Sequence, residues 1–364
     1  MKKIALIGNN NNNSSVTDGG RVKIRLFVNI LQREGKLSEV IELSKWYLHI
    51  PSLISKIKKA VNRKDVILIM AGPKGCRFTI PLVNKYNKGH KTRVVFCPVG
   101  IGTFDKIVKK LSPENVVKFL NGEDNFGITD KKMEKELKKI DLVVPENKTL
   151  SDAYKRFYGL DNVELLTNFR DVEPIEKSYS NDGELRIMYG SRICENKGIF
   201  DLLEAVSSLN ANGHTNISLT IYGDKQLTPK EDERFQKYLS DKIVFKGVLK
   251  QNEMIDEIKK HDLFCLPTKY HGEGTPGVFV ESFIAGTPVL SSSYSQAYAL
   301  IEEGVTGYIY KISDVEDLKA KILMILNDKA GLEKVGRAAQ EKSKQFCFEY
   351  NKEKFFKYFL GDEQ

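Results

Sequence analysis

Cysteine is scarce in this chain of 364 residues, and what there is lies scattered. The cysteines are odd in number and far apart, and no C-x-x-C pair occurs. This argues against a disulfide framework and against a structural zinc site, and it favours a reducing, cytoplasmic setting. They are Cys76, Cys97, Cys194, Cys265 and Cys347.

Long apolar runs are also missing. No segment approaches the roughly 18 apolar residues that a membrane-spanning helix needs. The short apolar stretch Ile4–Ile7 predicts a first strand rather than a signal peptide. Gly8 and the asparagines Asn9–Asn13 follow this strand, in place of the G-x-G-x-x-G turn of a dehydrogenase. We interpret the asparagines as a loop that could close over a ligand.

Charge is plentiful but uneven. The net charge is +9. Residues 1–182 hold 33 Lys and Arg against 21 Asp and Glu, a balance of +12, whereas residues 183–364 hold 24 against 27, a balance of −3. The excess indicates either a solvated surface or an anionic partner of the N-terminal half, such as a membrane surface. No zinc finger or basic-aromatic repeat points to nucleic acid.

Short Val- and Ile-rich runs alternate with amphipathic stretches along both halves of the chain. Parallel sheets with crossover helices have this pattern, so we expect two doubly wound α/β units. The polar, turn-rich residues 171–184 interrupt the pattern. The expected strands are Ile4–Ile7, Val40–Leu43, Val66–Met70, Val94–Val99, Leu142–Val144, Leu185–Tyr189, Ser218–Tyr222, Val244–Phe245, Leu263–Leu266, Val289–Ser291 and Tyr308–Tyr310.

Glycines and polar residues follow many of these strands. In open parallel sheets, ligands bind outside the carboxyl ends of the strands, and glycine lets the backbone approach them closely. Two such sheets facing each other would form one interdomain cleft. The residues at these ends include Gly19, Gly20, Gly72, Lys74, Gly100, Gly102, Arg192, Gly247 and Val248.

The segment from His271 to Pro288 carries two glutamates. Thr275 as N-cap, Pro276 as first helical residue and Gly286 after the last turn predict a helix over 276–285. Glu281 lies among apolar and small residues, and a buried carboxylate needs hydrogen-bond donors. A ligand's hydroxyl groups or an internal salt bridge could supply them. Glu273 lies just before the helix, where free amides favour an anion.

A second segment, residues 189–198, follows a strand and predicts a helix beginning near Asn196. Arg192 and Lys197 would then lie near the N-terminus of this helix, where cations oppose the helix dipole. A diphosphate between them would resolve the conflict, because Arg binds phosphate through two parallel hydrogen bonds. The alternative is a surface pair with Glu195.

Together these two segments resemble the retaining GT-B glycosyltransferases of the "glycosyl transferases group 1" family, many of which build bacterial capsule and exopolysaccharide. Glu273 and Glu281 match the paired-glutamate motif, and Arg192 and Lys197 match the diphosphate-binding pair. Residues 159–170 resemble the segment that ends such N-terminal domains. The resemblance implies two Rossmann-like domains: an acceptor-side domain at 1–170, a linker at 171–184 and a nucleotide-sugar-binding domain at 185–345. A C-terminal helix at 346–364 could pack back on the first domain.

The resemblance also implies roles for single residues. Arg192 and Lys197 would hold the donor diphosphate, Glu273 the transferred sugar and Glu281 the donor ribose. Front-face attack would retain the anomeric configuration. We expect no metal, since no strand ends in Asp-x-Asp, and no other cofactor. The implied donor-binding residues are Gly19, Gly20, Gly247, Val248, Gly274, Thr275, Pro276, Gly277 and Glu281, and the acceptor-side candidates are Gly72, Lys74, Gly100 and Gly102.

Two positions depart from the family pattern. Many relatives have a His after the fourth strand, where this chain has Cys97-Pro98, and Ala299 stands where relatives often have Glu. We therefore keep two alternatives: a nucleotide-sugar epimerase of the same fold, and a non-catalytic subunit that binds nucleotide sugar or glycan. The expected partners are a nucleotide sugar, a glycan or lipid-linked saccharide acceptor, and the inner face of an anionic membrane.

Overall fold

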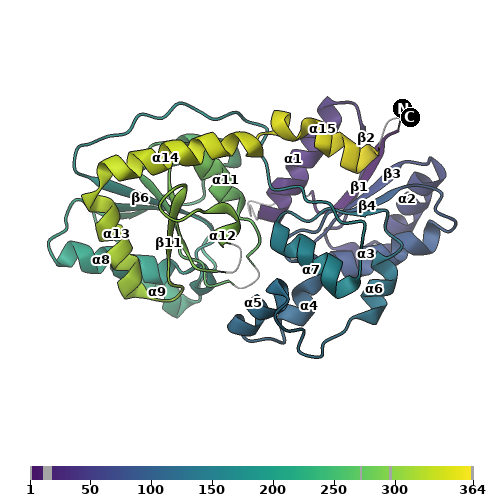
Figure 1. Cartoon of the computed structure of the whole chain (residues 1–364), viewed down its shortest axis with the longest axis horizontal. Helices are drawn as coiled ribbons and strands as arrows, with labels where there is room; N and C mark the ends of the chain where they lie inside the picture. The colour runs from purple at the N-terminus through teal and green to yellow at the C-terminus, as the bar shows by residue number, and fades with distance from the viewer. Residues whose placement is uncertain (1, 11–18, 271–272, 295–296, 362–364) are drawn as a thin grey trace. The chain divides into compact units, whose positions relative to one another are not determined.

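The computed structural model describes residues 2–10, 19–270, 273–294 and 297–361, and it divides into two compact units. Unit 1 comprises residues 1–168 together with 351–364, and unit 2 comprises residues 169–350. Each unit contains one parallel sheet with helices on its faces, which confirms the predicted fold class (Figure 1).

The sheet of unit 1 has the strand order β2-β1-β3-β4-β5, with every pair parallel. Its central strands are buried along their whole length, as expected for apolar runs covered on both faces. β4 is shorter than predicted and ends one residue before Cys97-Pro98, because proline has no N–H to continue a ladder. The strands are β1 (Ile4–Gly8), β2 (Leu37–Glu42), β3 (Val66–Met70), β4 (Val94–Phe96) and β5 (Leu142–Val143).

The crossover segments of unit 1 form α-helices and short 3₁₀ helices. α2 is amphipathic as predicted, with Leu53, Ile57 and Val61 buried against the core. The helices are α1 (Gly19–Arg33), η1 (Trp46–Leu48), α2 (Ile50–Asn62), α3 (Pro73–Tyr86), η2 (Gly102–Phe104), α4 (Asp105–Val108), α5 (Pro113–Asn121), α6 (Lys131–Leu137) and α7 (Lys148–Tyr158).

The C-terminal residues return to unit 1. α15 (Phe348–Leu360) places Phe355 and Phe359 against Phe27 of α1, with ring centroids 5.0 and 5.3 Å apart. These aromatic contacts, each worth about 0.5–1.5 kcal/mol beyond burial, attach the end of the chain to the first unit.

The sheet of unit 2 has the order β11-β10-β9-β6-β7-β8, again parallel throughout. Its strands are β6 (Leu185–Gly190), β7 (Ile217–Tyr222), β8 (Ile243–Phe245), β9 (Leu263–Leu266), β10 (Val289–Ser292) and β11 (Gly307–Tyr310). Its helices are η3 (Glu195–Lys197), α8 (Ile199–Ala211), α9 (Pro229–Tyr238), η4 (Gln251–Glu253), α10 (Met254–Lys259), α11 (Gly277–Ile284), α12 (Ala297–Leu300), α13 (Val315–Asn327), α14 (Lys329–Ser343) and η5 (Lys344–Phe346).

Residues 171–184 form neither helix nor strand, yet they are bound to unit 2. The Lys177 ammonium is buried and donates to the His261 carbonyl and the Thr287 hydroxyl, both at 2.5 Å. Tyr179 donates to the Gly286 carbonyl at 2.7 Å. Burial lowers the pKa of Lys177 to about 7. This segment therefore contributes a buried titratable group to unit 2.

Candidate active site

The predicted residues of unit 2 gather where its strands end. Arg192 follows β6, Gly247 follows β8, and Thr268 and Glu273 follow β9. All strands of this sheet are parallel, so their carboxyl ends share one edge, which is the usual ligand edge of such sheets.

A salt bridge joins the two segments that carry the motifs. The Lys197 ammonium contacts Glu273 Oε2, and both side chains are largely buried. The Thr268 hydroxyl donates to the same carboxylate oxygen at 3.1 Å. Lys197 also lies 5.5 Å from the centre of the Tyr270 ring. Lys197 and Glu273 are therefore held in fixed positions beside each other.

The backbone around Lys197 differs from the prediction. Glu195–Lys197 form a 3₁₀ turn, and α8 begins only at Ile199. Gly198 separates them with φ of +70°, and a Cβ atom there would lie 1.8 Å from the Pro267 carbonyl oxygen. The predicted helix start near Asn196 is wrong because only glycine fits at this close approach.

Arg192 lies in the loop after β6 and is half-buried. Its carbonyl accepts a hydrogen bond from the Tyr189 hydroxyl at 2.6 Å, which fixes the backbone of the loop. Within the described part of the chain its guanidinium has no carboxylate partner, so the predicted surface pair with Glu195 does not form. Glu195 instead lies near Arg234 and Lys269.

Helix α11 begins one residue later than predicted. Pro276 is its N-cap, with ψ of 125°, and Gly277 is its first residue. Proline's fixed φ suits extended and helical backbone alike, so its ψ decides the boundary. The end is as predicted: Ala285 is the C-cap, and Gly286 has φ of +69°.

Glu281 is 1% exposed, and side chains of the same unit supply its donors. Arg170 Nε donates to its Oε1 at 2.7 Å and Gln251 Nε2 at 2.5 Å. The prediction that this carboxylate needs donors is confirmed, and an internal salt bridge supplies one of them. Neither Arg170 nor Gln251 was predicted as a site residue.

Gly277 has a packing reason to be glycine. A Cβ atom at this position would lie 2.0 Å from Nη2 of Arg170. The first turn of α11 therefore lies directly against the guanidinium that reaches Glu281. Gly277, Arg170 and Glu281 form one packed group.

The remaining donor-side candidates of unit 2 lie close by in the chain. Gly247 has φ of +80°, its carbonyl accepts from the Gly223 amide at 2.9 Å, and Val248 is 51% exposed. Gly274 and Thr275 are buried just before α11. Ala299 is exposed on α12. His271 and Gly272 of the predicted segment, and Asn11–Asn13 of the predicted loop, lie outside the described residues.

The other candidates belong to unit 1. Gly19 and Gly20 begin α1, Gly72 is the N-cap of α3, and Lys74 is exposed in its first turn. Gly100 and Gly102 follow β4 with φ of +61° and +56°. A Cβ atom at Gly102 would lie 2.5 Å from the Tyr154 hydroxyl, so packing explains this glycine.

The position without the expected His has a different environment. Cys97 is buried, and burial raises the pKa of its thiol. Lys23 of α1 forms a salt bridge of 3.0 Å with Glu146, which follows β5, and both are buried. This pair was not predicted from the sequence. The sequence feature that pointed to it was the carboxylate of Glu146, just after the expected strand Leu142–Val144.

The described residues contain neither a membrane-spanning helix nor a metal-binding cluster. No helix there is long and apolar enough to span a membrane. No group of three or more His, Cys, Asp or Glu side chains there is arranged to hold a metal ion.

The family model that matches this chain lies within unit 2. Residues 172–342 match the family model "Glycosyl transferases group 1". The Campylobacter jejuni GalNAc-alpha-(1->4)-GalNAc-alpha-(1->3)-diNAcBac-PP-undecaprenol alpha-1,4-N-acetyl-D-galactosaminyltransferase is 29% identical over 208 residues, 56% of this chain and 55% of that protein. The amylovoran biosynthesis glycosyltransferase AmsK of Erwinia amylovora is 31% identical over 163 residues, 43% of this chain and 40% of its own. The chain thus matches about half the length of these curated relatives.

The fold has solved counterparts over the whole chain. A crystal structure of Anabaena Alr3699/HepE in complex with UDP and glucose has a TM-score of 0.71, with 14% identity and 100% of both chains covered. A sucrose-phosphate synthase from Thermosynechococcus elongatus has a TM-score of 0.70 at 17% identity, also covering 100% of both chains. These similarities confirm the predicted two-domain GT-B fold.

Proposed function

Because residues 172–342 match the family model "Glycosyl transferases group 1", we propose that this chain is a glycosyltransferase of that family. It moves a sugar from a nucleotide-sugar donor to a glycan or lipid-linked saccharide acceptor in cell-surface polysaccharide synthesis. The relatives named as glycosyltransferases and the crystal structure of similar fold in complex with UDP and glucose support this reading over an epimerase or a non-catalytic subunit.

One observation carries the proposal. The Arg192 guanidinium, in the loop after β6, has no carboxylate partner among the described residues, and Lys197 of the following turn is paired with Glu273. An ammonium has three N–H donors, so Lys197 can keep Glu273 and still donate to a phosphate oxygen. Arg192 adds a fork that fits a diphosphate. The two cations would stabilise the charge of the departing nucleoside diphosphate.

We propose that the two glutamates bind different parts of the donor. Glu273 would accept hydrogen bonds from hydroxyl groups of the transferred sugar beside Lys197. Glu281, oriented by Arg170 and Gln251, would hold the ribose. We propose that the reaction is metal-independent and retains the anomeric configuration, with a donor phosphate oxygen taking the proton of the acceptor hydroxyl. Gly72, Lys74, Gly100 and Gly102 remain the proposed acceptor-side positions.

We also propose that unit 1 binds reversibly to an anionic membrane surface, where lipid-linked acceptors reside. Lys56 and Lys59 of α2 are exposed, and each basic residue near such a surface is worth on the order of 1 kcal/mol. Arg63 is also exposed, but it pairs with Glu39 and Asp65, whose carboxylates offset its charge. Lys64, Lys85, Lys88 and Lys91 are exposed and remain candidates.

The direct test is a thermal-shift panel of nucleotide sugars, followed by a transfer assay with the donor that binds. A ligand at one hundred times its Kd adds about 2.7 kcal/mol of stability. Transfer to an acceptor, with unchanged yield after EDTA treatment and an α-configured product from an α-configured donor, would support each part. Release of an epimerised free sugar, or no donor binding at all, would contradict the proposal.

A further inference from the structure

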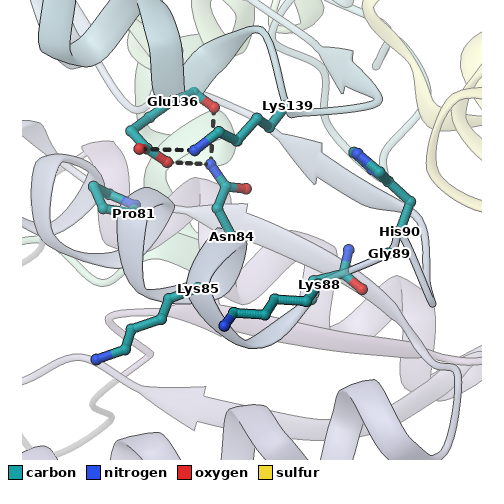
Figure 2. A pocket seen from close by; sticks show the side chains of 9 residues that line it. Pro81, Asn84, Lys85, Lys88, Gly89, His90, Glu136 and Lys139 are labelled. Atoms are coloured by element: carbon teal, nitrogen blue, oxygen red, sulfur yellow. Dashed lines mark hydrogen bonds and ion pairs between the residues drawn. The ribbon is translucent and has the colours of Figure 1, made fainter.

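Unit 1 has a polar surface pocket of about 420 Å³ between the end of α3 and the end of α6 (Figure 2). Its lining residues 87–90 precede β4, and Glu136 and Lys139 precede β5. The pocket therefore lies at the amino edge of the sheet of unit 1. The proposed transfer reaction uses the carboxyl edges and leaves this pocket without a role. Its lining residues are Pro81, Asn84, Lys85, Asn87, Lys88, Gly89, His90, Glu136 and Lys139.

The charge of the pocket is positive. Glu136 is its only carboxylate, and that group is already engaged: Asn84 Nδ2 donates to it at 2.8 Å and Lys139 Nζ at 2.9 Å. Burial alone would raise the pKa of Glu136, but these hydrogen bonds outweigh it and lower the pKa, so the group stays ionised. Three lysines therefore line a pocket that offers them one carboxylate.

Two of these lysines have no carboxylate partner in the described part of the chain. Lys85 lies 5.7 Å from the centre of the Tyr86 ring, and Lys88 is exposed. Lys58 of α2 lies 4.9 Å from the same ring and adds a further cation beside the pocket. In Figure 2 Lys85 and Lys88 lie below the Glu136–Lys139 pair, and His90 lies to its right.

The turn that carries this group is fixed by hydrogen bonds. Asn87 Nδ2 donates to the Thr92 carbonyl at 2.8 Å, and the Thr92 amide donates to Asn87 Oδ1 at 3.1 Å. His90 has φ of +49°, a left-handed conformation that is uncommon for a residue with a side chain. Residues held in such conformations concentrate at functional sites.

We propose that this pocket binds a phosphoryl group, as a phosphomonoester or a diphosphate. Lysines act as point charges for phosphate, and more than one of them around a single pocket favours a dianion over a carboxylate. The volume suits a small phosphorylated molecule or the headgroup of a phospholipid.

The test is a lysine footprint of the full chain. Acetylation of each lysine is measured by mass spectrometry with and without inorganic pyrophosphate, and with phosphatidic acid or phosphatidylcholine vesicles. We expect protection of Lys85, Lys88 and Lys139 by pyrophosphate or by phosphatidic acid vesicles, whereas Lys131 and Lys132, exposed on α6, react as before. Protection by the vesicles alone identifies a lipid headgroup, and protection by pyrophosphate identifies a soluble compound.

A pair of charge-matched variants controls for general screening. Lys88→Gln with Lys139→Gln should raise the pyrophosphate concentration for half-protection of Lys85 at least about tenfold, because charge-assisted hydrogen bonds are lost. Lys131→Gln with Lys132→Gln should leave it unchanged. Equal protection of all lysines, no protection by either probe, or equal loss in both variants would overturn the proposal. The pyrophosphate arm needs neither transfer activity nor vesicle binding, so it stands or fails separately from the proposed transfer reaction and from the proposed membrane contact of Lys85 and Lys88.

Discussion

The buried pair of Arg170 and Glu281 gives a quantitative test of how α11 is held. Arg170→Met removes the cation that pairs with the Glu281 carboxylate, which is 1% exposed. Removing one partner of a buried pair costs about 3–5 kcal/mol, because the remaining charge is left without compensation. That is a large part of the 5–15 kcal/mol that stabilises an ordinary domain. We expect Arg170→Met to lower the free energy of unfolding of unit 2 by this amount.

The double variant separates the pair from simple loss of packing. Glu281→Gln makes the buried group neutral, so adding it to Arg170→Met should recover part of the loss, with a coupling energy of about 0.5–3 kcal/mol. The measurement is urea unfolding monitored by far-UV circular dichroism. Arg337→Met is the matched control, since Arg337 pairs with Glu333 on the exposed face of α14 and its removal should hardly move the midpoint. Additive effects of the two single variants would refute the reasoning.

Four further outcomes follow from the geometry. Arg192→Ala should lower kcat/KM for the donor about ten- to a hundredfold and more than Arg192→Lys does, because only the guanidinium forms a fork; an unchanged donor kcat/KM would place the diphosphate elsewhere. Glu273→Gln should lower turnover but leave nucleoside diphosphate affinity, measured by calorimetry, nearly intact. The chain should sediment with anionic but not neutral vesicles at low salt, and Lys56→Glu with Lys59→Glu should weaken this; equal binding to both vesicles would argue against an electrostatic surface. Because the folded pKa of Lys177 is about 7, below that of the unfolded chain, the unfolded state binds more protons above pH 7, so stability should rise from pH 7 toward pH 10; a Lys177→Met variant with the same pH slope would contradict this.

The sequence predicted the local elements of the site well and its long-range contacts poorly. The end of α11 just before Gly286 and the need of Glu281 for donors both follow from residues that are close in the sequence. The donors themselves could not be predicted, because Arg170 and Gln251 lie 111 and 30 positions away in the chain. Lys197 and Glu273, 76 positions apart, were predicted to serve one donor molecule, but their direct salt bridge is a tertiary contact that no local pattern encodes.

The predicted starts of two helices were wrong, in each case at a single glycine or proline. The α-helix after β6 starts at Ile199 because Gly198 lies close to the Pro267 carbonyl. Pro267 follows β9, the neighbour of β6 in the sheet, and the sequence does not reveal that these two strands are neighbours. The N-cap of α11 lies one residue later than predicted because proline suits both extended and helical backbone, and Pro276 is extended here.

The return of the chain to unit 1 at Asn351 makes unit 2 an insertion within unit 1 rather than its successor. During synthesis the ribosome releases all of unit 2 before Phe355 and Phe359 are available to Phe27. Unit 2 can therefore fold first, at a stage when Phe27 on α1 of unit 1 is not yet covered by Phe355 and Phe359. A fragment cut after Asn168 would keep that surface exposed, so an isolated unit 1 needs residues 351–361 rejoined to it by a linker.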